Sequence, residues 1–164
     1  MSRGKTIVVV LLLVIGSVAA YYHYLTPEAR VKRFLFRTRD AIEAQNLPVI
    51  EGVLADDFRD SFGFGKERWL PIIRGSLSQW KDIKLRFLEL EVAVDGNQAT
   101  ARFQANGEAT RSSSLGTENL PDRQSYTFRN ITLKLARLDG KWQVIGWSNI
   151  NSETWQVPMP EVNP

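Results

Sequence analysis

Residues 125–151, SYTFRNITLKLARLDGKWQVIGWSNIN, read as two β-strands joined by a two-residue turn at Asp139-Gly140. Asp-Gly between alternating apolar and polar residues is a strong hairpin signal, because both turn positions need positive φ angles. The globular part of the chain is predicted to be arranged around this hairpin. The turn predicts three cross-strand pairs: Leu135 with Val144, Leu133 with Gly146, and Ile131 with Ser148.

The two faces of this hairpin have different predicted roles. One face is apolar and is predicted to form core, with Trp142 at its turn end. The other face carries Thr132, Lys134, Ile145 and Trp147, and its last two side chains are too apolar for a purely solvated surface. They predict either a patch for a protein partner or a second copy of the chain, or a surface shielded by the C-terminal tail.

The start of the first strand has the wrong parity for a regular strand. Tyr126 and Phe128 alternate out of phase with Ile131, so a regular strand would place them on opposite faces. A β-bulge near Arg129-Asn130 would bring both sets to one side and bend the strand.

A second hairpin is predicted immediately upstream. Residues 84–94 and 98–110 alternate in polarity, and Gly96-Asn97 lies at the centre of the turn between them. The predicted inner pairs are Val94 with Ala99, Val92 with Ala101, Leu90 with Phe103, and Leu88 with Ala105. The outer face is predicted to pair Glu91 with Arg102 and Glu89 with Gln104.

Three helices precede these strands. Thr26-Pro27 is a helix start, followed by an apolar stripe at helical spacing to residue 42. A short second helix is predicted over residues 49–54 and a third over residues 66–80. Helices followed by a meander of strands predict an α+β fold, in which a curved antiparallel sheet packs on the helices.

The first helix carries a basic face made of Arg30, Lys32, Arg33 and Arg37. Such a face is either solvated or in contact with anionic lipid headgroups, since the helix follows an apolar segment within two residues.

That apolar segment, residues 7–25, is uncharged when His23 is neutral and is just long enough to span a bilayer core. It predicts a single-pass membrane anchor, and the alternative is a signal peptide cleaved near Ala19. The predicted division is an anchor in residues 1–25, a domain in residues 26–151 and a proline-rich tail in residues 152–164. We expect the domain on the non-cytoplasmic, periplasmic side of the cell membrane, although basic residues flank the segment on both sides.

Composition excludes several classes of function. Without Arg3 and Lys5 the chain holds 19 basic and 18 acidic residues, whereas a nucleic-acid binder would need a basic patch or stripe. There is no cysteine, and the only histidine is His23. A catalytic histidine, a thiolate nucleophile and a metal site with histidine or cysteine ligands are therefore excluded from the domain.

The order of these elements resembles the nuclear transport factor 2-like superfamily, the cystatin-like α+β roll that includes SnoaL-like and ketosteroid isomerase-like domains. The resemblance covers about residues 27–151 and rests on four features: the first amphipathic helix, Leu54-Ala-Asp-Asp-Phe58 closing the second helix, the third helix before the sheet, and Asp139-Gly-Lys-Trp-Gln-Val144 leading the last strand. It implies a cone-shaped fold in which a bent sheet wraps a helix and leaves a pocket at its open end. Members include enzymes, ligand binders and assembly domains.

No catalytic set of the superfamily can be placed on this chain. Asp57 and Tyr126 are candidate pocket residues, but a loop-stabilising acid and a core aromatic are the simpler interpretations. The small residues Ala99, Ala101, Ala105 and Gly107 either let a helix approach the sheet or leave room for an apolar ligand. The aromatic walls of such a pocket would be Trp69, Phe103, Phe128 and Trp142.

We therefore expect a membrane-anchored, non-catalytic interaction or ligand-binding domain, an accessory subunit or assembly factor of a cell-envelope complex, without cofactor or metal. The alternative is a lyase or isomerase of the ketosteroid isomerase and scytalone dehydratase type, acting on a small apolar substrate through Asp57 or Tyr126. A soluble exported binder, released by cleavage near Ala19, is a third possibility.

Overall fold

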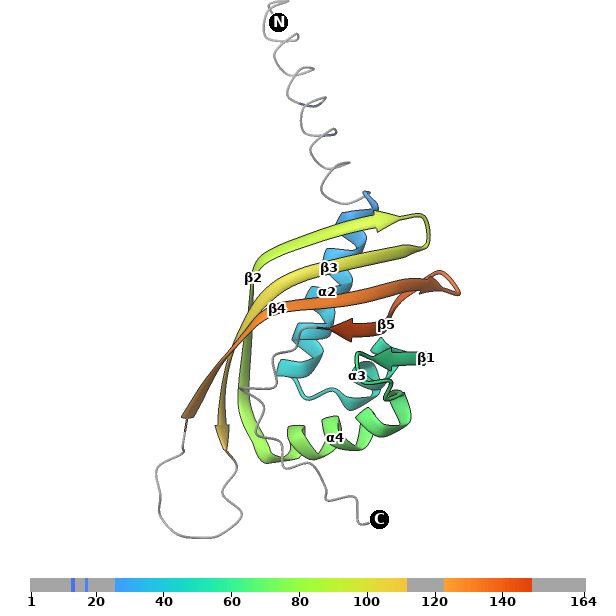
Figure 1. Cartoon of the computed structure of the whole chain (residues 1–164). Helices are drawn as coiled ribbons and strands as arrows, with labels where there is room; N and C mark the ends of the chain where they lie inside the picture. The colour runs from blue at the N-terminus through green and yellow to red at the C-terminus, as the bar shows by residue number, and fades with distance from the viewer. Residues whose placement is uncertain (1–12, 14–16, 18–25, 112–122, 149–164) are drawn as a thin grey trace, which may run out of the picture.

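The computed structural model describes residues 26–111 and 123–148, together with Leu13 and Ser17. Three long strands bend around one helix, and a second long helix crosses one end of the bend (Figure 1). The helices are α2 (Pro27–Glu43), α3 (Leu47–Val53) and α4 (Lys66–Gln79). The strands are β1 (Leu54–Asp60), β2 (Trp80–Asp95), β3 (Gln98–Arg111), β4 (Arg123–Leu138) and β5 (Lys141–Ser148), in the sheet order β1-β5-β4-β3-β2.

The start of α2 agrees with its sequence signal. The Thr26 hydroxyl accepts a hydrogen bond from the Ala29 amide at 3.2 Å, and Pro27 occupies the first turn. A capping oxygen satisfies one of the amides that a helix start leaves without a partner, and proline has no amide to satisfy.

The junction of α4 and β2 is held against the C-terminal end of α2. The side-chain amide of Gln45, just after this helix, donates to Leu77 O and Trp80 O at 2.8 and 2.6 Å.

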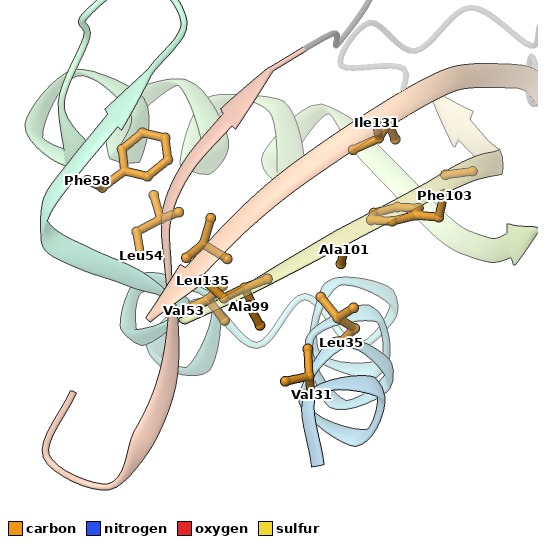
Figure 2. Close-up of a cluster of buried hydrophobic side chains, with 12 residues drawn as sticks. Val31, Leu35, Val53, Leu54, Phe58, Ala99, Ala101, Phe103, Ile131 and Leu135 are labelled. Atoms are coloured by element: carbon orange, nitrogen blue, oxygen red, sulfur yellow. The ribbon is translucent and has the colours of Figure 1, made fainter. Parts of the chain in front are cut away.

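The core lies between α2 and the middle of the sheet. Val31 and Leu35 point from α2 toward Ala99 and Ala101 of β3, and all four are buried in one cluster (Figure 2). The small side chains of Ala99 and Ala101 therefore allow α2 to approach the sheet closely. The remaining buried members are Val53, Leu54, Phe58, Phe103, Ala105, Ile131, Leu135 and Val144.

Both predicted turns and the predicted bulge are confirmed. Leu138 pairs with Lys141 across Asp139-Gly140, which have φ angles of 48° and 78°. The upstream hairpin turns at Gly96-Asn97, between the pair Asp95 and Gln98.

In β4 the register shifts at Asn130, whose φ is 56°. Phe128 pairs with Ala105, and Ile131 pairs with Phe103. The predicted bulge thus brings Tyr126 and Phe128 to the inner face.

The register of β2 was predicted correctly only from Glu91 to the turn. A second bulge at Glu89, with φ 53°, moves the earlier residues by one position. Phe87 therefore pairs with Ala105, where Leu88 was predicted, and Leu88 pairs with Gln104 on the outer face. The β2 bulge lies opposite Phe103 and the β4 bulge lies opposite Gln104, so the sheet bends at these adjacent positions on both sides of β3.

The sheet is mixed, which corrects the antiparallel prediction. Residues 54–60 form strand β1, which pairs in parallel with β5, and of the residues predicted to close the second helix only Leu54 does so, as the C-cap of α3. The strand is inconspicuous in the sequence because Asp56-Asp57 interrupts its apolar alternation. Its buried residues are Leu54, Ala55, Phe58 and Asp60.

The predicted outer position of Trp147 is wrong. The register of β5 shifts at Ile145, so Leu133 pairs with Trp147 and Lys134 pairs with Gly146. The Trp147 ring lies 4.6 Å from the Phe58 ring and 4.8 Å from the Trp69 ring, on the inner side. One extra residue in a strand transfers every later side chain to the other face.

Several predictions concern residues outside the described part. Among the described helices, none is long and apolar enough to cross a bilayer. The predicted anchor in residues 7–25 lies outside the described residues except for Leu13 and Ser17, and the predicted tail in residues 152–164 lies outside them entirely.

The parallel pairing of β1 with β5 depends on the absence of a side chain at Gly146. A Cβ at this position would lie 2.7 Å from the Arg59 carbonyl oxygen, which is backbone and cannot rotate away. We expect Gly146→Ala to lower the free energy of unfolding by about 2 kcal/mol, as measured by urea titration of the full chain. The matched control is Gly75→Ala in α4, where no atom lies within 4 Å and the change should be neutral or slightly stabilising. Equal effects of the two substitutions would contradict this account of Gly146.

Candidate functional site

The six residues predicted to bind a ligand do not form one cluster. Tyr126 and Phe128 lie together on β4, whereas Trp69 on α4 contacts the end of β5 through Trp147. Phe103 is buried in the core beside Phe87, at a ring distance of 4.8 Å. Trp142 packs against the core near the turn end of β5, opposite Arg137, and Asp57 is exposed. Trp69, Phe128 and Trp142 all pack against the core cluster that contains Phe103, and a ligand pocket among them stays a prediction.

Tyr126 and Phe128 are joined by a third ring that the sequence placed on a helix. Trp80 follows α4 directly and starts β2, and its ring meets the Tyr126 ring edge-to-face at 5.8 Å. The Tyr126 and Phe128 rings stack at 6.5 Å. We call these three side chains, Trp80, Tyr126 and Phe128, the aromatic wall. All three are only half-buried, so the wall presents apolar area at the end of the sheet beyond the bend.

Small residues of β3 lie beside the aromatic wall. Gly107 pairs with Tyr126, and Ala105 pairs with Phe128. The space above Gly107 is partly taken by Leu85, whose Cδ2 would lie 3.2 Å from a Cβ at that position. The hydroxyl of Tyr126 donates to the side-chain oxygen of Gln124, so the polar tip of the wall is engaged within β4.

The carboxylates fall into two groups. Asp56 and Asp57 are exposed, and Asp56 is paired with Lys66 at 2.9 Å. Asp60 is 7 % exposed, and it accepts hydrogen bonds from the Phe62 and Phe64 amides at 2.8 Å and from the Trp69 indole at 3.0 Å. Three donors shape the loop between β1 and α4 around this acid, which is a structural use of a buried carboxylate.

The outer face of the sheet is polar at the bend. Thr132 and Lys134 lie on this face as predicted, but without Trp147 they lack the apolar centre of the predicted interface. Where the two bulges meet, a shallow hollow of about 290 Å³ opens, and Gln104 donates to Glu89 there at 2.7 Å. Its lining residues are Glu89, Glu91, Arg102, Phe103, Gln104, Asn130 and Thr132.

Within the described part of the chain, the electrostatics show a satisfied interior. Every buried side-chain nitrogen and oxygen there has a hydrogen-bond partner, and no group of acids or histidines in residues 26–111 and 123–148 is arranged to hold a metal ion. The hydrogen bond from Arg74 to Glu51, at 2.6 Å, lowers the pKa of the Glu51 carboxyl below its ordinary value. This pair links α3 to α4 at the surface.

Sequence reasoning missed two functional roles for identifiable reasons. Trp80 fits the helical spacing of α4, and only the change of period at Lys81 marks it as the start of a strand. Asp60 is one of three acids within five residues, and nothing in their order distinguishes the buried one. Trp69 follows Asp60 by nine residues. This spacing indicates a hydrogen bond between the indole and the carboxylate only when the conformation of the loop between them is known.

The role of Asp60 can be separated from that of its exposed neighbour. We expect Asp60→Ala to lower the free energy of unfolding by about 2 kcal/mol, because two amides and an indole N–H lose their acceptor. Asp57→Ala removes the same charge from an exposed site and should change it by less than about 0.5 kcal/mol. Thermal or urea unfolding of both variants tests this difference, and a neutral Asp60→Ala would contradict the structural role.

No protein-family model and no curated protein sequence matches the chain. Solved structures do match its fold. A candidate dehydratase of the NTF2-like family from Streptomyces avermitilis aligns with a TM-score of 0.62 and 13 % identity, over 74 % of this chain and 95 % of that one.

Two further structures match over similar lengths of this chain. An NTF2-like protein of unknown function from Pseudomonas putida aligns with a TM-score of 0.56 and 21 % identity, over 74 % of this chain and 84 % of its own. Bd1075 of Bdellovibrio bacteriovorus gives a TM-score of 0.59 and 14 % identity, over 72 % of this chain, which spans only 39 % of that larger protein. The described domain therefore has the NTF2-like, cystatin-like fold, with three helices on a curved, mixed five-stranded sheet.

Proposed function

We propose that this chain is a membrane-anchored, non-catalytic binding domain that takes an apolar ligand at the aromatic wall and serves as an accessory component of the cell envelope. The observation that carries the proposal is the half-burial of Trp80, Tyr126 and Phe128. The Tyr126 ring contacts the rings of Trp80 and Phe128, so the three side chains at one end of a bent sheet offer a large apolar surface.

The placement of the acids favours binding over acid–base chemistry. A general acid or base must reach the substrate with a free carboxyl group. Asp57 faces solvent on the short strand β1, and Asp60 is held by three donors. These positions support binding over the lyase or isomerase alternative through Asp57 or Tyr126, since the Tyr126 hydroxyl donates to Gln124, and the fold by itself is shared by enzymes and binders.

The position of Trp147 on the inner side of the sheet favours a binding site there over one on the outer face. The predicted interface needed Ile145 and Trp147 side by side on the outside, and Trp147 now packs on Phe58 and Trp69. A partner or a second copy that binds Thr132 and Lys134 would meet a polar surface. We therefore assign the apolar ligand to the aromatic wall.

Photolabelling of the full chain in lipid nanodiscs tests the ligand site. The probe is 3-trifluoromethyl-3-phenyldiazirine, a small apolar carbene precursor, and adducts are located by peptide mass spectrometry. We expect adducts on Trp80, Tyr126 and Phe128. In Phe128→Asn the number of adducts on the wall should fall about tenfold, because a polar side chain in the apolar surface weakens binding of the apolar probe. Adducts on residues 7–25 would report probe dissolved in the bilayer.

Two controls accompany this experiment. Phe128→Leu keeps an apolar side chain and should retain most of the labelling. Phe62→Asn changes the most exposed aromatic residue in the described part, at 77 % exposure, and should not alter adducts on the wall. Labelling of the wall no stronger than labelling of Phe62 would overturn the proposed site.

The membrane anchor has its own test. We expect the full chain, expressed in a bacterial host, to stay in the membrane pellet after alkaline carbonate washing and to have the mass of the uncleaved sequence. Val14→Arg with Ile15→Arg should release it or prevent insertion, because both positions lie near the middle of residues 7–25 and each arginine at the bilayer centre costs about 2.5–3.5 kcal/mol. A shortened mass consistent with cleavage near Ala19 would establish the signal peptide instead. Protease protection in spheroplasts would test the proposed periplasmic side.

A further inference from the structure

We propose that the basic face of α2 binds the headgroups of anionic phospholipids, and that it does so in the leaflet from which the domain emerges. This inference rests on the proposed anchor. The basic face consists of Arg30, Lys32, Arg33 and Arg37, all of which are exposed.

The basic residues lie opposite the buried side of α2. Val31 and Leu35 point into the core, whereas Arg30, Arg33 and Arg37 recur at spacings of three and four residues along the exposed side. Because the helix packs against β2, its core-facing side is fixed and the basic residues cannot rotate inward. The fold therefore presents this basic face as a constant feature of the surface.

Two of the three acids of α2 are engaged outside the basic face. Asp40 is paired with its neighbour Arg39 at 2.6 Å. Glu43 accepts the amide of Leu85 in β2 at 2.7 Å and lies 3.7 Å from Lys84. Both acids are in the last turn and a half, so the first three turns contain four basic residues and only Glu28 as an acid.

The helix dipole does not account for the position of these basic residues, although Glu28 in the first turn is placed favourably. The N-terminal end of a helix carries partial positive charge, so acids are favourable there and bases near the C-terminal end. In α2 the last turn contains no basic residue. Beyond α2 and the two bases at residues 3 and 5, the chain holds 14 basic and 15 acidic residues. The excess positive charge is thus concentrated in two places, on either side of the apolar segment.

Chain geometry keeps the basic face close to the bilayer. Only Thr26 separates the end of the apolar segment, Leu25, from the first residue of α2, and two residues span at most about 7 Å. With a rise of 1.5 Å per residue, Arg30 lies within about 12 Å of that end. The headgroup layer is about 5–7 Å thick and the Debye length at physiological salt is about 8 Å, so Arg30 and Lys32 remain within reach of lipid phosphates.

Lipid enrichment around the full chain tests the proposal. The chain is reconstituted in bilayers of phosphatidylcholine and phosphatidylglycerol, extracted with mild detergent, and its retained lipids are quantified by mass spectrometry. We expect phosphatidylglycerol to be enriched around the wild type and to fall at least fivefold toward the bulk ratio when Arg30, Lys32, Arg33 and Arg37 are replaced by Gln. The enrichment should also disappear in 1 M salt.

The matched control removes equal charge elsewhere. Arg86, Arg102, Arg129 and Lys134 are also three arginines and one lysine, all exposed on the strands, and their replacement by Gln should leave the enrichment intact. Replacement of Arg30, Arg33 and Arg37 by Lys should also keep it, since headgroups attract any cation, and this variant guards against loss of folding. Equal enrichment in the wild type and the quadruple α2 variant would overturn the proposal, as would enrichment that survives 1 M salt.

Failure of the anchor has a separate signature. If residues 7–25 do not hold the chain in the bilayer, the wild type leaves the carbonate-washed pellet. If the anchor holds but the basic face does not bind lipid, the wild type and the α2 variant both stay in the pellet with the same lipid ratio.

Discussion

The bend at Gln104 is the constraint on which the rest of the domain depends. A bulge at Glu89 in β2 lies opposite Phe103 and a bulge at Asn130 in β4 lies opposite Gln104, and each has a positive φ angle that an ordinary L-residue adopts rarely. Together they turn three long strands around α2 (Figure 1). Without the shift at Asn130, Tyr126 and Phe128 would face outward. The aromatic wall therefore exists because the sheet is bent.

The other end of the sheet is closed by a short parallel pair. Strand β1 can lie beside β5 because Gly146 has no side chain to strike the Arg59 carbonyl. The chain then turns around the Asp60 carboxylate, whose three hydrogen bonds set the loop that starts α4. Asp60, which the sequence alone would allow as a catalytic acid, is thus engaged in holding α4 against the end of the sheet. The position of α4 in turn sets the position of Trp80.

The same fold separates the two surfaces that we propose to be functional. The aromatic wall lies beyond the bend, at the junction of α4 and β2, and the basic face lies at the start of α2, close to the apolar segment of the chain. An apolar ligand and anionic headgroups would therefore bind at opposite ends of one scaffold. The outer face of the sheet, polar around Gln104 and lacking Trp147, contributes to neither.

The sequence alone determined the features that depend on local chemistry. Asp139-Gly140 and Gly96-Asn97 gave the turns, Thr26-Pro27 gave the start of α2, and the parity of Tyr126 and Phe128 gave the bulge at Asn130. Only the tertiary structure decided the bulges at Glu89 and Ile145, the strand character of residues 54–60 and the engagement of Asp60. Each of these depends on a distant partner: one extra residue is accommodated only when a neighbouring strand fixes the register, and a carboxylate is buried only when donors converge on it. The aromatic wall was therefore predictable at Tyr126 and Phe128 but not at Trp80, and the sequence indicated neither the inner position of Trp147 nor the burial of Asp60.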